Sequence, residues 1–336
     1  MLEYPKYIER TLQLARLGAY YVAPNPMVGA LLVDEQGGVL GEGWHHAYGG
    51  PHAEVECFRD VEKRNISVNY KNCTLFVNLE PCSHYGKTPP CAKLIIEKGV
   101  GHVVVGCLDP NPKVAGKGVQ MLRDAGIKVE VGVCEDQCRE LNKRFLCLQE
   151  KGRPYVTLKW AQTKDGYLDR LRDENANQSP VVISTPLTKQ LVHQLRAENM
   201  AILVGSGTAI KDNPRLLTTH WPGRNPIRVL LDRRGRVPMN SRIFSDDAET
   251  IVYRECTDWP FILSDLAKRG IHSVLVEGGA QVLHTIIQSG VWDEMHIEIS
   301  DVELGEPGVA APSVKLPYLP TTILDNHYMY EIKNQH

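Results

Sequence analysis

Two successive series of strand-like and helix-like segments constrain the fold of this chain more than any other feature of its sequence. In the first series, short apolar runs predict strands at 28–33, 39–44, 74–79, 103–106 and 129–133. The segments beside them predict helices at 8–19, 51–60, 92–98, 118–125 and 135–149. Strands that alternate with helices pair at least partly in parallel, so this series predicts a layered α/β domain.

The second series begins after a structure-breaking segment, Lys151-Gly152-Arg153-Pro154. Apolar runs there predict strands at 155–160, 201–204, 227–231, 250–253, 273–276 and 296–299. Helices are expected after Pro186, at 262–268 and after Gly279. The polar stretch 169–179 is expected to be a mobile loop. The second half of the chain is therefore also predicted to be α/β.

The length and composition favour two globular domains. At roughly 100–200 residues per domain, the 336 residues suggest two, which we place at 1–149 and 150–336. A hydrophobic fraction of 43% is enough to bury a core in each. The formal net charge of −2 argues against a nucleic-acid partner bound through bulk electrostatics. No apolar run approaches the ~18–20 residues of a membrane span, so we expect a cytoplasmic protein without a membrane partner.

The nine cysteines are distributed unevenly, with eight of them in the first half of the chain. An odd number of cysteines in a cytoplasmic protein argues against a disulfide framework. Most are expected to be buried as small hydrophobic side chains. The asymmetry indicates that any cysteines that bind a metal lie in the first domain.

Two short motifs of the first domain together predict a zinc site. His52 lies in Pro51-His52-Ala53-Glu54. Cys82 and Cys91 lie at the two ends of a Pro-rich segment that follows the next expected strand. One imidazole and two thiolates form a donor set that suits tetrahedral zinc. Three protein ligands leave the fourth position to water, as in catalytic sites, whereas a structural site has four protein ligands.

The two motifs are informative mainly in combination. A lone His-x-Glu or a lone Cys-x8-Cys is weak, but here they occur in order, each near the start of an expected helix that follows a strand. Glu54 lies close enough to His52 to exchange protons with the metal-bound water without binding the metal. His84 is an alternative ligand, although we rank it as facing the substrate.

A longer series of motifs identifies a family resemblance for the first domain. In order, they are Pro24-Asn25-Pro26-x-Val28-Gly29, Gly41-x-Gly43-x-His45, Pro51-His52-Ala53-Glu54, Glu80-Pro81-Cys82-Ser83-His84-x-Gly86-x-Thr88-Pro89-Pro90-Cys91 and Asp109-Pro110-Asn111-Pro112. The series resembles the deaminase domain of the bifunctional riboflavin-biosynthesis deaminase/reductases, and the resemblance runs from about residue 5 to residue 147. It implies a cytidine-deaminase-like α/β/α fold.

The resemblance also implies an activity and a set of site residues. The implied reaction is hydrolytic deamination of a diaminohydroxypyrimidine that carries a phosphoribosylamino group. His52, Cys82 and Cys91 would bind one zinc ion, and Glu54 would shuttle protons. The residues that would line the substrate pocket are Asn25, His45, His84, Lys87, Asp109 and Asn111. Asn25 and Asp109 each precede a proline, so an ordinary turn role stays open for both.

The residues of the second domain say less about its chemistry. It lacks a Gly-x-Gly-x-x-Gly after a strand. Gly278-Gly279, between an expected strand and an expected helix, either binds an anion at the helix N-terminus or forms a tight turn. Gly205-Ser206-Gly207 is a second loop of this kind. Arg233, Arg234 and Arg236 could hold a 2′-phosphate or could be a solvated charged run.

Motifs of the second domain resemble the reductase half of the same family. They include 154–161, Asp165-Gly166, Leu195-Arg196-Ala197, 205–216, 226–232 and Glu277-Gly278-Gly279. The resemblance implies a dihydrofolate-reductase-like α/β fold and NADPH-dependent reduction of the ribosyl group to ribityl. The implied NADPH contacts are Ala161, Thr208, Asp212, Gly278 and Gly279. The implied substrate contacts are Lys159, Arg196, Leu216 and Glu277, with Arg196 at the phosphate.

The chain departs from this family pattern at a few positions and leaves alternatives open. Thr163-Lys164 replaces Ser-Leu, Val181 or Val182 replaces a tryptophan, and Thr219 or His220 occupies the place of an arginine. One alternative is a zinc nucleobase or nucleoside deaminase with an inactive or regulatory second domain. Another is a non-catalytic interaction module that zinc holds together. The sequence does not decide whether the protein forms a homo-oligomer.

Overall fold

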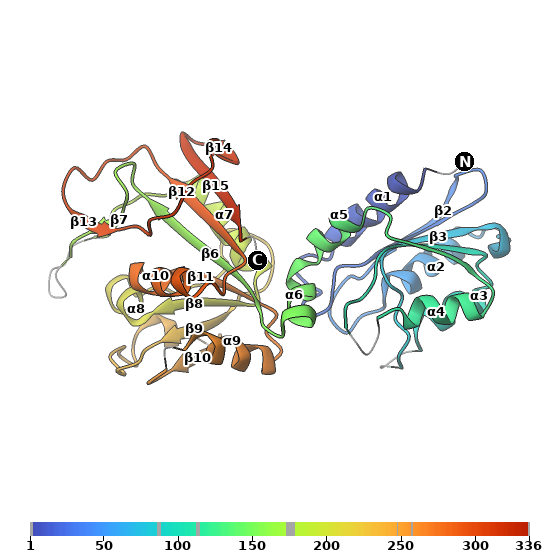
Figure 1. Cartoon of the computed structure of the whole chain (residues 1–336), viewed down its shortest axis with the longest axis horizontal. Coiled ribbons are helices and arrows are strands. Elements are labelled where there is room, and N and C mark those ends of the chain that lie inside the picture. The colour runs from blue at the N-terminus through green and yellow to red at the C-terminus, as the bar shows by residue number, and fades with distance from the viewer. Residues whose placement is uncertain are drawn as a thin grey trace. The chain divides into compact units, whose positions relative to one another are not determined.

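The structure is a computed structural model that describes residues 3–85, 89–111, 115–172, 179–246, 248–256 and 258–334. The chain divides into two compact units, Met1–Gly152 and Arg153–His336 (Figure 1). In the described part of the chain, no helix has the length and apolar character needed to cross a bilayer.

The first unit is built on a five-stranded sheet of order β2-β1-β3-β4-β5. Its strands are β1 (Gly29–Val33), β2 (Val39–Trp44), β3 (Thr74–Leu79), β4 (His102–Cys107) and β5 (Lys128–Val131). Strand β1 pairs antiparallel with β2 and β3, whereas β3, β4 and β5 are parallel. All residues of β1 and β3 are buried, as expected of strands that are covered on both faces.

Helices cover both faces of this sheet. They are α1 (Tyr4–Arg16), α2 (Ala53–Lys63), α3 (Cys91–Lys98), α4 (Lys117–Asp124), α5 (Glu135–Leu141) and α6 (Lys143–Lys151), and a 3₁₀ turn, η1, spans Tyr70–Asn72. Helices α2, α3 and α4 pack on the face that carries Ala30 and Leu32, whereas α1 and α5 pack on the face that carries Leu31 and Val33. The alternation of side chains along β1 supplies both cores. The predicted α/β/α arrangement is confirmed.

The prediction of a single helix at 135–149 is wrong in one respect, because two helices, α5 and α6, occupy this stretch. The break lies at Asn142, which has a φ of −105° and a ψ of 19°. Its side-chain amide accepts a hydrogen bond from the Met27 N–H and donates one to the Met27 carbonyl. This contact ties the residue between the two helices to the backbone just before β1.

The second unit contains an eight-stranded sheet of order β10-β9-β8-β11-β6-β12-β15-β14. Its strands are β6 (Tyr155–Gln162), β8 (Ala201–Gly205), β9 (Ile227–Leu231), β10 (Thr250–Tyr253), β11 (Ser273–Gly278), β12 (Glu294–Ile299), β14 (Thr322–Leu324) and β15 (His327–Lys333). The run from β10 to β12 is parallel, and β15 and β14 are added antiparallel. A separate two-stranded sheet pairs β7 (Tyr167–Arg170) with β13 (Gly308–Ala310).

The helices of the second unit again cover both faces of the large sheet. They are α7 (Pro186–Glu198), α8 (Ser206–Asp212), α9 (Trp259–Lys268) and α10 (Ala280–Ser289), and a 3₁₀ turn, η2, spans Arg242–Phe244. Helices α9 and α10 bury Ile262, Leu266 and Leu283 in one core, whereas the other face packs Ile202 and Leu230 under residues of α7 and α8. The predicted α/β class is confirmed for this unit too.

Several short elements of the second unit were not expected from the sequence. Strand β7 includes Asp169 and Arg170, the start of the stretch expected to be a loop, and residues 173–178 lie outside the described part of the chain. Helix α8 forms directly after β8, and β13, β14 and β15 form near the C-terminus. The two-stranded sheet joins segments more than 130 residues apart, a pairing that local periodicity does not encode.

Candidate active sites

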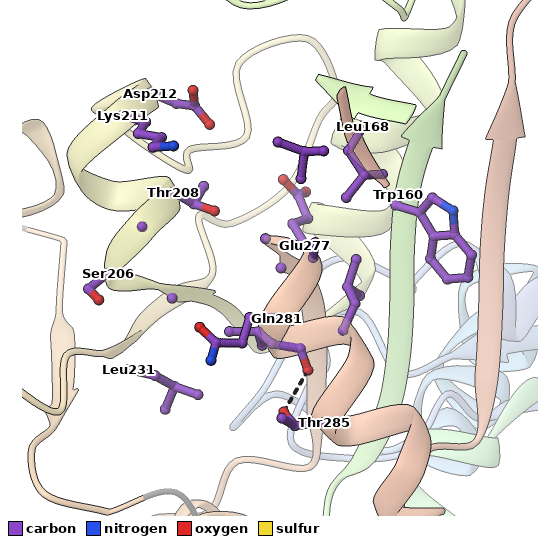
Figure 2. A pocket seen from close by; sticks show the side chains of 18 of the residues that line it. Trp160, Leu168, Ser206, Thr208, Lys211, Asp212, Leu231, Glu277, Gln281 and Thr285 are labelled. Carbon is purple, nitrogen blue, oxygen red and sulfur yellow. Dashed lines mark hydrogen bonds between the residues drawn. The ribbon is translucent and has the colours of Figure 1, made fainter. Parts of the chain in front are cut away.

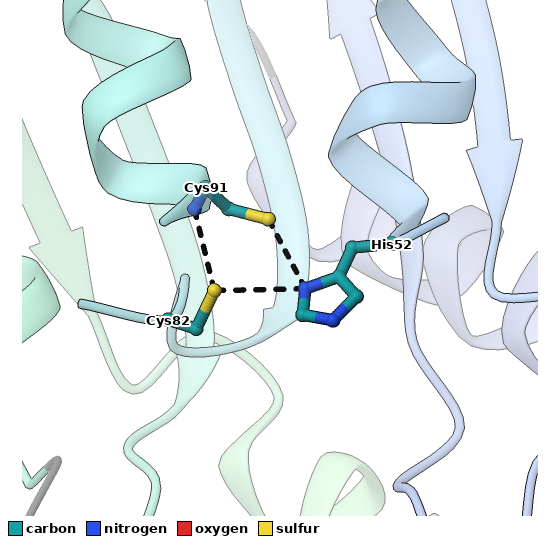
Figure 3. A group of neighbouring side chains, drawn as sticks. All are labelled: His52, Cys82 and Cys91. Atoms are coloured by element: carbon teal, nitrogen blue, oxygen red, sulfur yellow. Dashed lines mark hydrogen bonds between the residues drawn. The ribbon is translucent and has the colours of Figure 1, made fainter. Parts of the chain in front are cut away.

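Three potential metal ligands converge in the first unit. His52 immediately precedes α2, Cys91 is the first residue of α3, and Cys82 lies in the loop between β3 and α3. Their donor atoms all lie within 4.8 Å of one another, and Figure 3 shows the three side chains pointing toward a common centre. The Nδ1 atom of His52 is 3.2 Å from Cys91 Sγ and 3.5 Å from Cys82 Sγ.

This geometry fits a tetrahedral zinc ion. With Zn–N near 2.0 Å and Zn–S near 2.3 Å, tetrahedral angles separate an N and an S ligand by about 3.5 Å. The two measured N–S distances, 3.2 and 3.5 Å, are close to that value. Among the His, Cys, Asp and Glu side chains of the described residues, this group is the one with metal-binding geometry. An imidazole and two thiolates are the donors that zinc prefers.

The two cysteines are electrostatically unequal. A hydrogen bond from the Cys91 thiol and a second from His52 lower the pKa of Cys82, so that its thiolate is favoured. The same hydrogen bond with Cys82, together with burial, raises the pKa of Cys91. The backbone N–H of Cys91 also donates to Cys82 Sγ at 3.3 Å. A zinc ion held here would bind both groups as thiolates, because metal binding releases protons from its cysteine ligands.

Glu54 lies in the first turn of α2 and is almost completely buried. Desolvation, reinforced by the nearby Cys82 thiolate, raises the pKa of its carboxyl group. Its position depends on close contact between α2 and β2. A Cβ atom at Gly43 would lie 2.4 Å from the carbonyl oxygen of Ala53, so the helix rests on the strand with no side chain between them.

A cavity of about 250 Å³ connects the metal-ligand cluster to the predicted substrate-binding residues. His52, Glu54 and Cys82 line it together with Asn25, His45, His84, Asp109 and Asn111. The structure therefore brings together all the predicted deaminase-site residues except two. Cys91 lies directly behind the lining, against His52 and Cys82, and Lys87 lies outside the described residues.

Asn25 and His45 form an oriented pair on one wall of this cavity. His45 Nδ1 lies 2.8 Å from the carbonyl oxygen of Pro51, which can only accept, so Nδ1 carries the proton. His45 Nε2 then accepts from Asn25 Nδ2 at 3.0 Å. Burial lowers the pKa of His45, which favours this neutral form. The arrangement commits the amide NH₂ of Asn25 to His45 and leaves its Oδ1 as the acceptor for other groups.

Some residues of this cavity were not expected from the sequence. Glu80 lines it at the end of β3, and Phe145 and Gln149 reach it from α6. Glu80 belongs to the Glu-Pro-Cys motif, so its position two residues before Cys82 could have indicated that it lies at the site. Phe145 and Gln149 carried no local signal, because only the packing of α6 brings them to the site.

The second unit contains a larger cavity, of about 780 Å³, at the carboxyl ends of its parallel strands. Such ends are the usual ligand-binding edge of an α/β sheet. The predicted residues that line it are Ala161, Thr208, Asp212, Gly278, Gly279, Lys159 and Glu277. Figure 2 shows Thr208 and Asp212 on α8, and Gln281 on α10, around this space. Gln281, and Trp160 of β6, line the cavity without having been expected from the sequence.

The Gly278-Gly279 turn has a conformation that side chains would resist. Both residues have positive φ, 83° and 72°. A Cβ atom at Gly279 would lie 2.9 Å from Thr208 Oγ1, so the turn also passes close to the start of α8. Gly279 precedes the first residue of α10, whose first N–H groups have no partner within the helix. Gly278-Gly279 is thus a tight turn, and it lies at a helix N-terminus, where an anion is favoured.

Charged side chains are arranged in pairs near this cavity. Arg196 binds the carboxylate of Glu277 through two nitrogens, at 2.8 and 2.7 Å. Lys159 lies 3.8 Å from the fully buried carboxylate of Glu298, and burial lowers the pKa of Lys159. Glu298 in turn accepts hydrogen bonds from Ser184 and His327. Glu298 and His327 were not identified from the sequence.

Arg196 and Leu216, which the resemblance places on the substrate side, do not line this cavity. Leu216 is buried in the core that contains Ile202 and Leu230. Arg196 reaches the cavity only through the Glu277 carboxylate that it binds. By contrast, Arg233, Arg234 and Arg236 line the cavity at the end of β9, which places these cations next to the space that a ligand would fill.

Comparison with known families agrees with this division. Residues 3–107 match the family described as the cytidine and deoxycytidylate deaminase zinc-binding region. Residues 154–321 match the RibD C-terminal domain. The riboflavin biosynthesis protein RibD of Aquifex aeolicus is 38% identical over 89% of this chain and 87% of that protein. RibD of Bacillus amyloliquefaciens is also 38% identical, over 92% of this chain and 86% of that protein.

Solved structures with the same architecture cover both units. RibD of Acinetobacter baumannii superimposes with a TM-score of 0.87 at 33% identity, over 99% of both chains. A diaminohydroxyphosphoribosylaminopyrimidine deaminase/5-amino-6-(5-phosphoribosylamino)uracil reductase of Thermotoga maritima has a TM-score of 0.87 at 35% identity, again over 99% of both chains. The similarity is therefore not restricted to one of the two units.

Proposed function

The chain belongs to the RibD family of riboflavin biosynthesis proteins, and from this premise we propose how each of its two units works. The protein is a bifunctional enzyme of riboflavin biosynthesis, with a zinc-binding deaminase domain and a reductase domain. The first reaction is the hydrolytic deamination of 2,5-diamino-6-(5-phosphoribosylamino)pyrimidin-4-one. The second is the reduction of the ribosyl group of its product to ribityl.

The deaminase proposal rests on one observation, that Glu54 and the His52, Cys82 and Cys91 cluster meet at a single cavity. These three ligands would hold one zinc ion per chain, with the fourth position open to the cavity. Zinc bound there would supply the Lewis acidity that makes water a nucleophile at neutral pH. Glu54 would take a proton from the attacking water and deliver it to the amino nitrogen that leaves as ammonia.

We assign recognition of the pyrimidine to the walls of the same cavity. The free Oδ1 acceptor of Asn25 suits an N–H group of the ring or its amino substituents. Asp109 and Asn111 provide polar groups from the loop after β4. Lys87, which the family resemblance assigns to the substrate, would meet the phosphate.

The substitution Glu54→Gln tests this mechanism. The amide fills the same space but cannot carry the proton, so we expect zinc content to stay at the wild-type level while deamination falls by at least about 10²-fold. Metal analysis and ammonia release measure the two effects. Glu56→Gln, in the same helical turn but partly exposed, is the matched control and should stay active. Full deaminase activity of Glu54→Gln would remove Glu54 from the mechanism.

The reductase proposal places NADPH in the cavity of about 780 Å³. NADPH would supply the hydride that reduces C1′ of the opened sugar. Thr208 and the Gly278-Gly279 turn would hold its diphosphate, and Ala161 and Asp212 would contact the rest of the cofactor. Arg233 and Arg234, which line the same cavity, offer cations for the 2′-phosphate that distinguishes NADPH from NADH.

On the substrate side we propose Lys159 and Glu277 as direct contacts. Both line the cavity, and each is balanced by a partner of opposite charge, Glu298 and Arg196 respectively. Arg196 and Leu216 stay in the proposed substrate set through the family resemblance. The Arg196 guanidinium is bound to Glu277, so contact with the substrate phosphate would require it to share or release that carboxylate.

A cofactor oxidation assay tests the reductase. We expect the purified protein to oxidise NADPH when the deaminated ribosylaminopyrimidine is supplied, and not when it is omitted, because the substrate carbon must be present to accept the hydride. NADH at the same concentration should react more slowly. Absorbance at the nicotinamide band measures both rates. Folded protein that leaves NADPH unchanged with authentic substrate would favour the alternative of an inactive or regulatory second domain.

The proposed compartment is the cytoplasm. The proposed ligand pair, Cys82 and Cys91, consists of free thiols. Free thiols suit a reducing compartment, where thiolates stay available to a metal.

A further inference from the structure

Glu80 connects two parts of the deaminase site that are separate in the sequence. It follows β3 directly and precedes the ligand Cys82 by two residues. Its side chain is buried, with 5% of the residue exposed. Its two carboxylate oxygens accept hydrogen bonds from four backbone N–H groups, those of Asp109, Gly116, Gly118 and Val119. All four donors belong to the segment from the loop after β4 to the start of α4.

One oxygen of Glu80 caps α4. Oε1 accepts from Gly118 at 2.8 Å and from Val119 at 3.2 Å, two N–H groups of the first turn that have no partner within the helix. The helix has no side-chain cap of its own, because the residue before it is Gly116. A negative charge at this end is also favoured by the helix dipole. Glu80 therefore supplies from a different segment what an N-cap residue normally supplies.

The other oxygen holds Asp109, which lines the substrate cavity, and Gly116. Oε2 accepts from Gly116 at 3.0 Å and from Asp109 at 3.3 Å. Asp109 Oδ1 in turn accepts from the N–H of Asn111 at 2.9 Å. Asp109 and Asn111 both line the cavity and form one wall of it. The Glu80 carboxylate positions this wall by binding the backbone N–H of Asp109.

The start of α4 also presses directly on the segment that carries the metal ligand. A Cβ atom at Gly118 would lie 2.0 Å from the carbonyl oxygen of Pro81, the residue between Glu80 and Cys82. This close approach leaves no room for a side chain or water between helix and loop. The positions of Cys82 and of the wall at Asp109 are therefore linked through only Glu80, Pro81 and the start of α4.

We propose that Glu80 is a positioning residue of the deaminase, which sets the distance between the zinc ligands and the wall formed by Asp109 and Asn111. The inference rests on the proposed deaminase function and adds to it a residue that does not itself react. A carboxylate is required because it offers acceptors on both oxygens. In glutamine, one oxygen becomes an NH₂ group, which would face two N–H donors instead of accepting from them.

The substitution Glu80→Gln is the direct test. We expect the KM for the diaminopyrimidine to rise about tenfold and kcat to change by less than about threefold, because the wall moves while zinc and Glu54 stay in place. Zinc content and the reductase activity of the same molecules should equal those of the wild type. Glu97→Gln, at an exposed site on α3, is the matched control and should leave all four quantities unchanged. An unchanged KM in Glu80→Gln would overturn the proposal.

A double-mutant cycle separates positioning from general destabilisation. If Glu80 acts through the wall, Glu80→Gln should have little further effect on KM in an Asn111→Ala background. Fully additive effects, or a parallel loss of zinc and of deaminase kcat, would overturn the positioning role. Should Glu80→Gln fold poorly, Glu80→Asp, which keeps the charge on a shorter side chain, serves in its place, with a smaller rise in KM expected.

Amide hydrogen exchange tests the anchoring without relying on activity. In Glu80→Gln, the amides of Asp109 and of Gly116–Val119 should exchange faster than in the wild type, whereas those of α3 should not. Unchanged exchange overturns the inference even if the enzyme proves to act on another pyrimidine. Conversely, a wild-type protein that does not deaminate the diaminopyrimidine contradicts the proposed function, while faster exchange would still support the anchoring by Glu80.

Discussion

Folding holds the imidazole of a single residue, His193, in its neutral form. It packs against the ring of His220 at a centroid distance of 4.8 Å, and its Nδ1 accepts the N–H of Thr219. Burial, with a further contribution from the positive charge of Arg196, lowers the pKa of His193 to about 4. The neutral imidazole of His193 therefore places no second positive charge beside Arg196.

This pKa predicts a pH dependence of stability. In the unfolded chain the pKa of His193 is about 6.5, so between about pH 6.5 and pH 4 the unfolded state binds more protons. The contribution of neutral His193 is therefore complete above about pH 6.5 and is lost as the pH falls toward 4. We expect His193→Gln to lose less stability than the wild type over this window. Thermal unfolding from pH 7.5 to 4.5 measures it, and identical declines would contradict the prediction.

At the scale of elements, the contact between β2 and α2 decides where the deaminase machinery lies. Gly41 and Gly43 bring the strand against the helix without intervening side chains. The first turn of α2 carries Glu54, and the residue before it is His52. The sequence predicted the strand and the helix separately. The spacing between them depends on the two glycines, whose importance becomes visible only when the elements are packed.

The substitution Gly43→Ala tests this contact. The new methyl group would meet Ala53 O at 2.4 Å and Cys57 N at 2.2 Å, so α2 must shift. We expect a stability loss of about 2 kcal/mol or more and a reduced zinc content. Denaturant unfolding and metal analysis measure these effects. The control Val39→Ala, at an exposed position of the same strand, should change neither by a comparable amount.

At the scale of the whole molecule, each unit has its own sheet, its own core and its own cavity. The proposed zinc ligands belong to the first unit, and the proposed NADPH residues belong to the second. Among the described residues, two hydrophobic clusters lie within the first unit and two within the second. Because each proposed site is built from residues of one unit, we expect damage to one site to leave the other active.

Metal removal should therefore affect the two activities differently. We expect a strong zinc chelator to abolish deamination, because the nucleophile depends on the metal, and to leave the reduction of pre-deaminated substrate by NADPH nearly unchanged. Parallel assays of ammonia release and NADPH oxidation measure this, and added zinc should restore the first. Equal loss of both activities would show that the second unit also depends on the metal.

Local sequence was sufficient to predict the α/β class, most strands of the parallel sheets and the His and Cys residues that converge as a candidate zinc site. These depend on local periodicity and on residue types with specific chemistry, which short segments contain. Only packing between distant segments places the break at Asn142, Phe145 in the cavity, the Arg196–Glu277 pair and the hydrogen bonds of Glu80. Each of these is a contact between segments far apart in the chain, where the partner is chosen by packing and by the need to satisfy buried polar groups.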